Sequence, residues 1–175
     1  ELQSSGFGGA AYGQAVQFRF GGAMAAARFG AVAALNRSAG GSQNRLAHTG
    51  SMGYTDGVPK IPGAAVSFED AETIAHLAKA GKVKLHLTLT PQTLPDVESY
   101  NVIGDLKGTE KPDEVVIVSG HLDSWDLGQG AIDDASGVAV SMAVAKLLVD
   151  MKIRPKRTIR VIAWMNEENG GRGSA

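Results

Sequence analysis

The chain has 175 residues and a formal net charge of −1, with 43% hydrophobic and 20% charged residues, a balance that excludes an intrinsically disordered chain and a polycationic nucleic-acid-binding protein. There is no cysteine, so disulfide scaffolds, cysteine-ligated metal sites and thiol catalysis are excluded as well. The longest apolar stretches, such as residues 138–145, are far shorter than the roughly 20 residues that a membrane span needs, and we expect no such span.

The first third of the chain differs in composition from the rest. Residues 1–63 hold 13 of the 23 glycines and carry five basic and two acidic residues, whereas residues 64–175 carry twelve basic and sixteen acidic residues. Such a shift indicates two structural regions. We expect the linker between them at residues 91–95, which begin and end with proline.

In the first region, apolar and polar residues alternate over residues 14–20, a pattern typical of a half-buried strand. The alanine-rich residues 23–35 follow a pair of glycines and predict a helix that ends before Asn36. Residues 36–63 are rich in glycine and proline, and they predict a long loop with at most short strands.

A second helix is predicted over residues 68–80. Ser67 and Asp70 have the spacing of a capping box, in which the serine hydroxyl accepts a hydrogen bond from the first helical turn. Gly81 has the place of a left-handed glycine that ends the helix. Over residues 83–90, apolar residues alternate with lysine, histidine and threonine, which predicts a second, half-exposed strand.

The second region has the pattern of a strand–helix–strand unit. Residues 115–119 form a short apolar run of the kind found in strands buried on both faces. Residues 136–150 predict a largely apolar helix, and residues 158–164 predict another strand. Strands joined by such a helical crossover are parallel, so we expect a parallel pair.

Polar and acidic residues gather where this unit predicts a ligand site. In an open parallel sheet, ligands bind outside the carboxyl ends of the strands. Both predicted strands end at that edge, and the helix between them starts there. The candidate residues are His121, Asp123, Asp133, Asp134, Glu167 and Glu168.

The spacing of these residues favours a metal site. Residues two apart in an extended segment share a face, so the Asp123 carboxylate can accept a hydrogen bond from one nitrogen of a metal-binding His121 imidazole. Without a cation, the adjacent acidic pairs would repel one another. Because one carboxylate of the 167–168 pair can bind the metal, its neighbour is free to take a proton from a water in the site.

The other histidines and the two tryptophans are given no such role. His48, His76 and His86 have no acidic residue at ligand spacing, and they are interpreted as surface or helix-face residues. Trp125 and Trp164 are interpreted as packing residues near the cleft, with contact to substrate as the weaker alternative.

Three segments of the second region closely resemble the M28 family of zinc aminopeptidases and carboxypeptidases. They are residues 116–126 (VIVSGHLDSWD), 133–137 (DDASG) and 164–168 (WMNEE). The first region looks like the protease-associated (PA) domain carried by this group. The residues with this second likeness are 31–37, 48–50, 56–62 and 66–71.

Carried over to this sequence, the family pattern implies a di-zinc peptidase site. His121 becomes a ligand of one zinc, Asp133 the carboxylate that bridges the two, and Glu168 a ligand of the second zinc. Glu167 becomes the general base, and Asp123 the residue that orients the imidazole.

The resemblance also implies the domains. Residues 1–92 are expected to form a β-rich PA-like region, incomplete at its N-terminus. Residues 93–175 are expected to form the first part of an α/β, phosphorylase/hydrolase-like zinc-peptidase sheet, in which Asp134 matches a residue tied to backbone geometry. The family's two remaining zinc ligands, an Asp and a His, come from downstream of the glutamate pair, so we expect the sequence to be an internal fragment of a longer peptidase.

The function that the resemblance implies is zinc-dependent exopeptidase action on small peptides, by a homodimer in an extracytoplasmic location and without a nucleic-acid partner. One alternative is a non-catalytic PA-type interaction module or an inactive fragment, because two metal ligands are absent. Another is an aminocyclase-like or glutaminyl-cyclising relative, which the loop around Trp125 and the PA-like region both disfavour.

Overall fold

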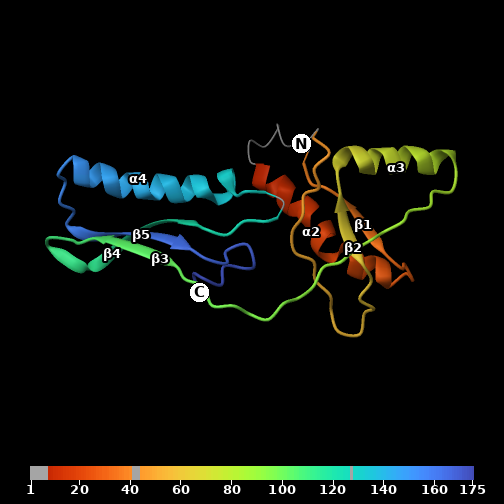
Figure 1. Cartoon of the computed structure of the whole chain (residues 1–175), viewed down its shortest axis with the longest axis horizontal. Coiled ribbons are helices and arrows are strands. Elements are labelled where there is room, and N and C mark those ends of the chain that lie inside the picture. The colour runs from red at the N-terminus through yellow and green to blue at the C-terminus, as the bar shows by residue number, and fades with distance from the viewer. Residues whose placement is uncertain (1–7, 41–43, 127) are drawn as a thin grey trace. The chain divides into compact units, whose positions relative to one another are not determined.

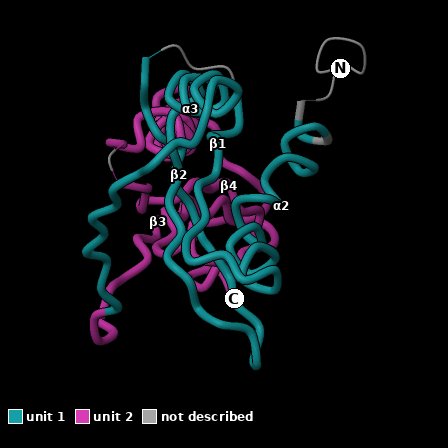
Figure 2. The backbone as a smooth tube through the Cα atoms, turned by 90° about the vertical axis from the view of Figure 1, so that its right-hand side faces the viewer, with its two compact units in different colours: residues 1–93 teal, residues 94–175 magenta. Residues whose placement is uncertain are grey.

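The computed structural model describes residues 8–40, 44–126 and 128–175. They fall in two units, Glu1–Thr93 and Leu94–Ala175, drawn in teal and magenta in Figure 2. The boundary lies within residues 91–95, where the composition predicts a linker. The first unit contains α2 (Gly8–Ala27), β1 (Ala34–Arg37), β2 (Gly63–Val66) and α3 (Phe68–Ala80). The second contains β3 (Val102–Leu106), β4 (Lys111–His121), the single turn η1 (Ala131–Ala135), α4 (Ser136–Asp150) and β5 (Arg157–Trp164) (Figure 1).

Residues 14–20 lie inside helix α2, so the strand predicted there is wrong. The side chains that turn inward follow a helical period instead: Val16 and Arg19 are half-buried, and Ala23 and Ala27 are buried. They recur every three or four residues, which places them on one side of the helix. The alternation rested on only three apolar residues, and packing of α2 on β1 outweighs so short a pattern.

Helix α2 ends at Ala27, so the helix predicted over residues 23–35 is right only at its start. Gly30 has a φ of 79°, a left-handed conformation that glycine adopts at little cost. Its N–H donates to the carbonyl of Ala27 at 3.0 Å, and the chain then enters β1. Among the described residues, no helix is both long and apolar enough to cross a membrane.

Strands β1 and β2 form a two-stranded parallel sheet, with Ala34 opposite Gly63 and Arg37 opposite Val66. The described part of residues 38–62 between them contains neither helix nor strand, which confirms the predicted loop. Residues 8–40 and 44–93 contain two helices and two strands, and each strand is only four residues long. They therefore do not show the β-rich character expected of this region.

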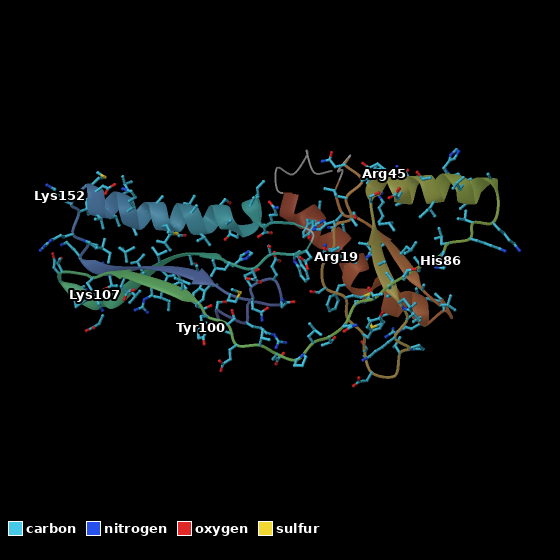
Figure 3. The ribbon with its side chains drawn as sticks, in the orientation of Figure 1. Arg19, Arg45, His86, Tyr100, Lys107 and Lys152 are labelled. Carbon is cyan, nitrogen blue, oxygen red and sulfur yellow. The ribbon has the colours of Figure 1, made fainter. Side chains whose placement is uncertain are left out.

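Helix α3 has the predicted bounds and the predicted N-terminal cap. The hydroxyl of Ser67 accepts a hydrogen bond from the Asp70 N–H at 3.0 Å and donates to the Asp70 carboxylate at 2.8 Å. That carboxylate also pairs with Arg45, which is labelled in Figure 3. The end of the helix differs from expectation, because Gly81 has a φ of 165°, an extended and not a left-handed conformation.

Replacing Ser67 with Ala is expected to lower the free energy of unfolding by about 1 kcal/mol, because the Asp70 N–H then loses its acceptor. Ser67 is only 2% exposed, so water does not readily replace the lost hydroxyl. Urea unfolding measures the change. Ser99→Ala is the matched control, since Ser99 is exposed and lies outside the helices and strands; equal midpoints for the two variants would contradict the capping role.

Residues 83–90 form no strand, so the second strand prediction is also wrong. Leu85, Leu87 and Leu89 are 53%, 39% and 41% exposed. A strand needs a hydrogen-bonded neighbour, and this segment pairs with neither β1 nor β2. Alternation without a partner therefore leaves the segment irregular.

The second unit is built on a three-stranded sheet in the order β3-β5-β4. Strands β4 and β5 are parallel, with Val115 opposite Thr158 and His121 opposite Trp164, and β3 is antiparallel to β5. Helix α4 has the predicted bounds and packs against β4 and β5 (Figure 1). The predicted strand–helix–strand unit is thus confirmed.

Strand β4 is less buried than its apolar run predicts. Val116 and Ile117 are neighbours and so point to opposite faces of the sheet, yet they are 44% and 53% exposed. The expectation of a strand buried on both faces is therefore wrong for this chain. The buried residues among the described part of the unit lie on the central strand β5, on α4 and at the end of β4, and they are Thr158, Ile162, Ala163, Ser141, Gly120 and His121.

An ion pair joins the antiparallel strands β3 and β5. Arg160 donates through Nε and Nη2 to the two carboxylate oxygens of Asp105, at 2.7 and 2.8 Å. This two-point contact lowers the pKa of Asp105 below its ordinary value, mainly through the hydrogen bonds from Arg160. Proton binding to Asp105 is therefore coupled to unfolding.

Replacing Asp105 with Asn is expected to lower the urea midpoint at pH 7 and to have little effect in acid. Because the folded-state pKa is depressed, the ion pair stabilises the fold above the ordinary carboxyl pKa of 3.8, and this stabilisation is lost as the pH falls through the lower folded-state value. Urea unfolding of both proteins from pH 7 to about pH 2.5 measures the difference. A difference that stays constant over this range would contradict the assignment.

Candidate metal centre

The sheet brings the two polar segments to one edge. His121 is the last residue of β4 and lies opposite Trp164, the last residue of the parallel strand β5. The next residue, Leu122, donates its N–H to the Trp164 carbonyl at 2.7 Å. Glu167 and Glu168 follow within four residues of that strand end, so they lie beside His121 as the parallel pairing predicts.

The start of helix α4 packs directly on the end of β4. Gly120 makes this approach possible, because a Cβ at this position would lie 2.5 Å from the Val138 nitrogen and 2.7 Å from an Asp134 carboxylate oxygen. Asp134 joins the two elements: Oδ2 accepts from the His121 N–H at 3.1 Å and Oδ1 accepts from the Gly137 N–H at 3.0 Å. The Asp134 carboxylate thus binds two backbone N–H groups, in line with the role in backbone geometry that the resemblance implies for it.

Three predicted ligands come together at this edge. The ligand atoms of His121, Asp133 and Glu168 lie within 4.8 Å of one another, and His121 Nε2 is 2.9 Å from Asp133 Oδ1. One imidazole nitrogen and two carboxylate oxygens are ligand types that Zn²⁺ accepts at about 2.0–2.2 Å. The residues present therefore fit a divalent cation, and the Asp133 side chain, 78% exposed, leaves the cluster open to solvent.

The His121 ring is oriented by the backbone of Asp123 and not by its carboxylate. Nδ1 of the ring lies 2.8 Å from the Asp123 carbonyl oxygen, whereas the nearest Asp123 carboxylate oxygen is 3.6 Å away. The hydrogen bond expected between the ring and the carboxylate is thus replaced by one to the carbonyl. That bond places the proton on Nδ1 and turns Nε2 towards Asp133.

The surroundings of His121 attract positive charge. Burial disfavours the charged imidazolium, but the Asp123 carbonyl and the carboxylates of Asp133 and Glu167 outweigh burial and raise the pKa of His121. A proton and a metal ion therefore compete for the same nitrogen.

The Asp123 carboxylate instead holds the glutamate pair. Its two oxygens accept hydrogen bonds from the backbone N–H groups of Glu167 and Glu168, at 2.9 and 3.1 Å. Burial raises the pKa of Asp123, but these two donors, with the Asp123 N–H and the nearby His121, more than compensate and leave it below the ordinary value. Asp123 thus stays charged and fixes the backbone from which both glutamates project.

The two glutamates have different surroundings. Oε2 of Glu167 lies 3.7 Å from His121 Nε2, and the side chain is 49% exposed, so this carboxylate is beside the cluster and open to water. Glu168 is half-buried, and burial raises its pKa, opposed by a hydrogen bond from Trp125 and assisted by the nearby charges of Asp133 and Glu167.

Two residues that were not among the predicted site residues help to form the site. The indole N–H of Trp125 donates to Glu168 Oε2 at 2.7 Å, which gives this residue a polar contact beyond the packing role assigned to it. Asn101 accepts from the Met165 N–H at 2.8 Å and donates to the Gly173 carbonyl at 2.7 Å, so it fixes both ends of the loop that carries the glutamates. No local sequence pattern predicts this role of Asn101, because its hydrogen-bond partners are more than 60 residues away in sequence.

The chain is similar to known peptidases over most of its length. Residues 101–175 match the model of peptidase family M28. Carboxypeptidase Q of Mus musculus is 46% identical over 94% of this chain and 35% of its own length, and probable leucine aminopeptidase 2 of Aspergillus oryzae is 33% identical over 74% of this chain and 25% of its own length. The chain thus spans about a third of the length of the curated carboxypeptidase Q that it matches.

A solved structure agrees in fold and in sequence. The crystal structure of a peptidase M28 precursor from Shewanella amazonensis SB2B is similar with a TM-score of 0.80 and 43% identity, over 91% of this chain and 36% of that chain. Sequence and structure therefore point to the same family. Residues 101–175 match peptidase family M28 in sequence, and the chain is similar in fold to a solved member of that family.

Proposed function

We propose that the protein is a zinc-dependent exopeptidase that hydrolyses peptide bonds of small peptides. The observation that carries this proposal is the convergence of His121, Asp133 and Glu168, with ligand atoms within 4.8 Å of one another, in a chain whose residues 101–175 match the M28 family. The relatives named carboxypeptidase and aminopeptidase support exopeptidase action.

The metal ligands in this proposal are His121, Asp133 and Glu168. These three residues would hold the zinc, and Asp133, whose oxygen lies next to His121 Nε2, would be the carboxylate shared between two ions, as the resemblance to the family implies. Bound zinc supplies Lewis-acid chemistry, which lowers the pKa of a water molecule and polarises the scissile carbonyl.

Glu167 is the general base. Its carboxylate is close to the cluster but is not one of the three clustered ligands, and its exposure leaves it accessible to the attacking water. An oxygen of this carboxylate takes the proton from that water and later gives it to the leaving amine. Asp123 holds the Glu167 N–H, so the base projects from a fixed backbone.

The proposal includes the wider setting of the enzyme. Residues 1–92 are a PA-like region that precedes the peptidase part, and the protein acts as a homodimer in an extracytoplasmic location. The PA-like region is supported by the resemblance of residues 31–37, 48–50, 56–62 and 66–71 to the PA domain of the family. The homodimer and the location are supported by the similarity to carboxypeptidase Q.

The direct test is release of free amino acids from a panel of dipeptides by the purified protein. The proposal expects release that stops when 1,10-phenanthroline removes the metal and returns when Zn²⁺ is added back. Release that persists at full rate in metal-free protein would contradict zinc-dependent catalysis. No release from any dipeptide by zinc-loaded protein would favour the alternative of a non-catalytic module.

A further inference from the structure

Trp125 contacts the carboxylate of Glu168 through its indole ring. Its indole nitrogen lies 2.7 Å from Glu168 Oε2. The indole N–H is only a donor, so the carboxylate oxygen must accept. We infer that Trp125 is a positioning residue for the metal centre, whose N–H holds the Glu168 carboxylate in the orientation that faces His121 and Asp133.

The loop that carries Trp125 contacts both the backbone and the side chain of Glu168. Asp123 accepts from the Glu168 backbone N–H at 3.1 Å, and Trp125, two residues later, donates to the Glu168 side chain. The backbone bond alone leaves the side-chain torsions of a glutamate free, and fixing them costs conformational entropy. The indole bond fixes the carboxylate before a ligand arrives.

The donor itself is held in place. The Trp125 carbonyl accepts from the Gly128 N–H at 2.9 Å, which ties the backbone of the tryptophan to a nearby residue. Trp125 and Glu168 are both half-buried, so their hydrogen bond is partly shielded from water. A neutral donor also leaves the charge of the carboxylate available to a cation, whereas a lysine or arginine at this position would neutralise it.

A purely apolar role for Trp125 gives a different expectation. An indole that only fills space can be replaced by a phenyl ring with little effect on the carboxylate, because Phe keeps a six-membered aromatic ring and loses the five-membered ring that carries the N–H. The Trp125→Phe variant therefore separates the two roles. Trp164→Phe is the matched control, since it removes the second of the two tryptophans. The Trp164 carbonyl accepts from the Leu122 N–H, a backbone bond that the substitution leaves intact.

The experiment is a Zn²⁺ titration of the protein and its variants by isothermal titration calorimetry, with circular dichroism to check folding. We expect Trp125→Phe to raise the zinc dissociation constant about tenfold, the lower end of the effect of substitutions behind metal ligands. Trp164→Phe is expected to leave it unchanged, and Glu168→Gln to raise it more than Trp125→Phe does.

The outcomes separate this inference from the proposed function on which it rests. An unchanged dissociation constant in Trp125→Phe, together with weaker binding in Glu168→Gln, would overturn the positioning role alone. Unchanged binding in Glu168→Gln would overturn the metal site of the proposed function, and the positioning role with it.

A spectroscopic measurement covers the case in which Trp125→Phe does not fold. In the Trp164→Phe protein all tryptophan emission comes from Trp125. We expect saturating Zn²⁺ to shift this emission, because the Glu168 carboxylate that accepts the indole bond then also binds the metal. An emission spectrum that Zn²⁺ does not change would overturn the inference.

Discussion

Replacing Glu167 with Gln is expected to lower kcat for dipeptide hydrolysis by about 10²- to 10⁴-fold, the usual contribution of a general base. Gln keeps the shape of the side chain but cannot take a proton. The zinc content is expected to stay the same, because Glu167 is not among the three clustered ligands. Steady-state kinetics and elemental analysis of the same preparations measure both quantities.

The matched control for this variant is Glu98→Gln, which changes the net charge equally at an exposed residue outside the helices and strands. It is expected to leave kcat unchanged. If Glu167→Gln kept full activity, the mechanism with Glu167 as base would be wrong. If it lost both activity and zinc, Glu167 would instead act as a ligand.

Replacing Asp133 with Asn is expected to weaken zinc binding by more than about 100-fold, beyond the effect of losing a residue behind a ligand, and to abolish activity. The Asp133 oxygen lies 2.9 Å from His121 Nε2, and the amide of Asn is a poorer ligand without charge. Because the Asp133 side chain is 78% exposed, the unfolding midpoint is expected to change little. Calorimetric zinc titration and urea unfolding check the two expectations.

Two control variants make this result specific. His86→Ala alters a histidine on the segment after α3 (Figure 3), in the other unit, and is expected to leave zinc binding unchanged. Asp134→Asn alters the neighbouring carboxylate, which accepts from two backbone N–H groups, and is expected to lower the unfolding midpoint. Equal zinc binding by Asp133→Asn and the unchanged protein would contradict the ligand assignment.

The strand–helix–strand unit could be predicted because its signals are local and agree with one another. Helix α4 begins at Ser136 and ends at Asp150, as its apolar pattern indicates, and it joins two apolar runs that become β4 and β5. The general rule that such strands are parallel then brings His121 and Glu168 to the same edge. For this reason the sequence predicted that the candidate residues gather at one edge, and the resemblance to the family then selected His121, Asp133 and Glu168 among them.

The errors in the first unit have a common physical cause. The alternation over residues 14–20 and over residues 83–90 describes which side chains are apolar, but it does not supply a partner strand. Residues 14–20 instead pack as a helix against β1, and residues 83–90 remain irregular. Gly30, whose left-handed conformation ends α2, lay inside the predicted helix and was given no weight.

The finer contacts of the site depend on pairs far apart in sequence. The two-residue spacing of His121 and Asp123 indicated a bond between ring and carboxylate. In the structure, the Asp123 carboxylate instead accepts hydrogen bonds from the N–H groups of Glu167 and Glu168, 44 and 45 residues away. The bond from Trp125 to Glu168 spans 43 residues and has no local signal either.

The most direct test of the metal centre is anomalous X-ray diffraction at the zinc absorption edge, from crystals of the protein grown with Zn²⁺. We expect anomalous density within ligand distance, about 2.0–2.2 Å, of His121 Nε2 and of carboxylate oxygens of Asp133 and Glu168. Anomalous density only at other residues, with this cluster empty in zinc-saturated crystals, would contradict it.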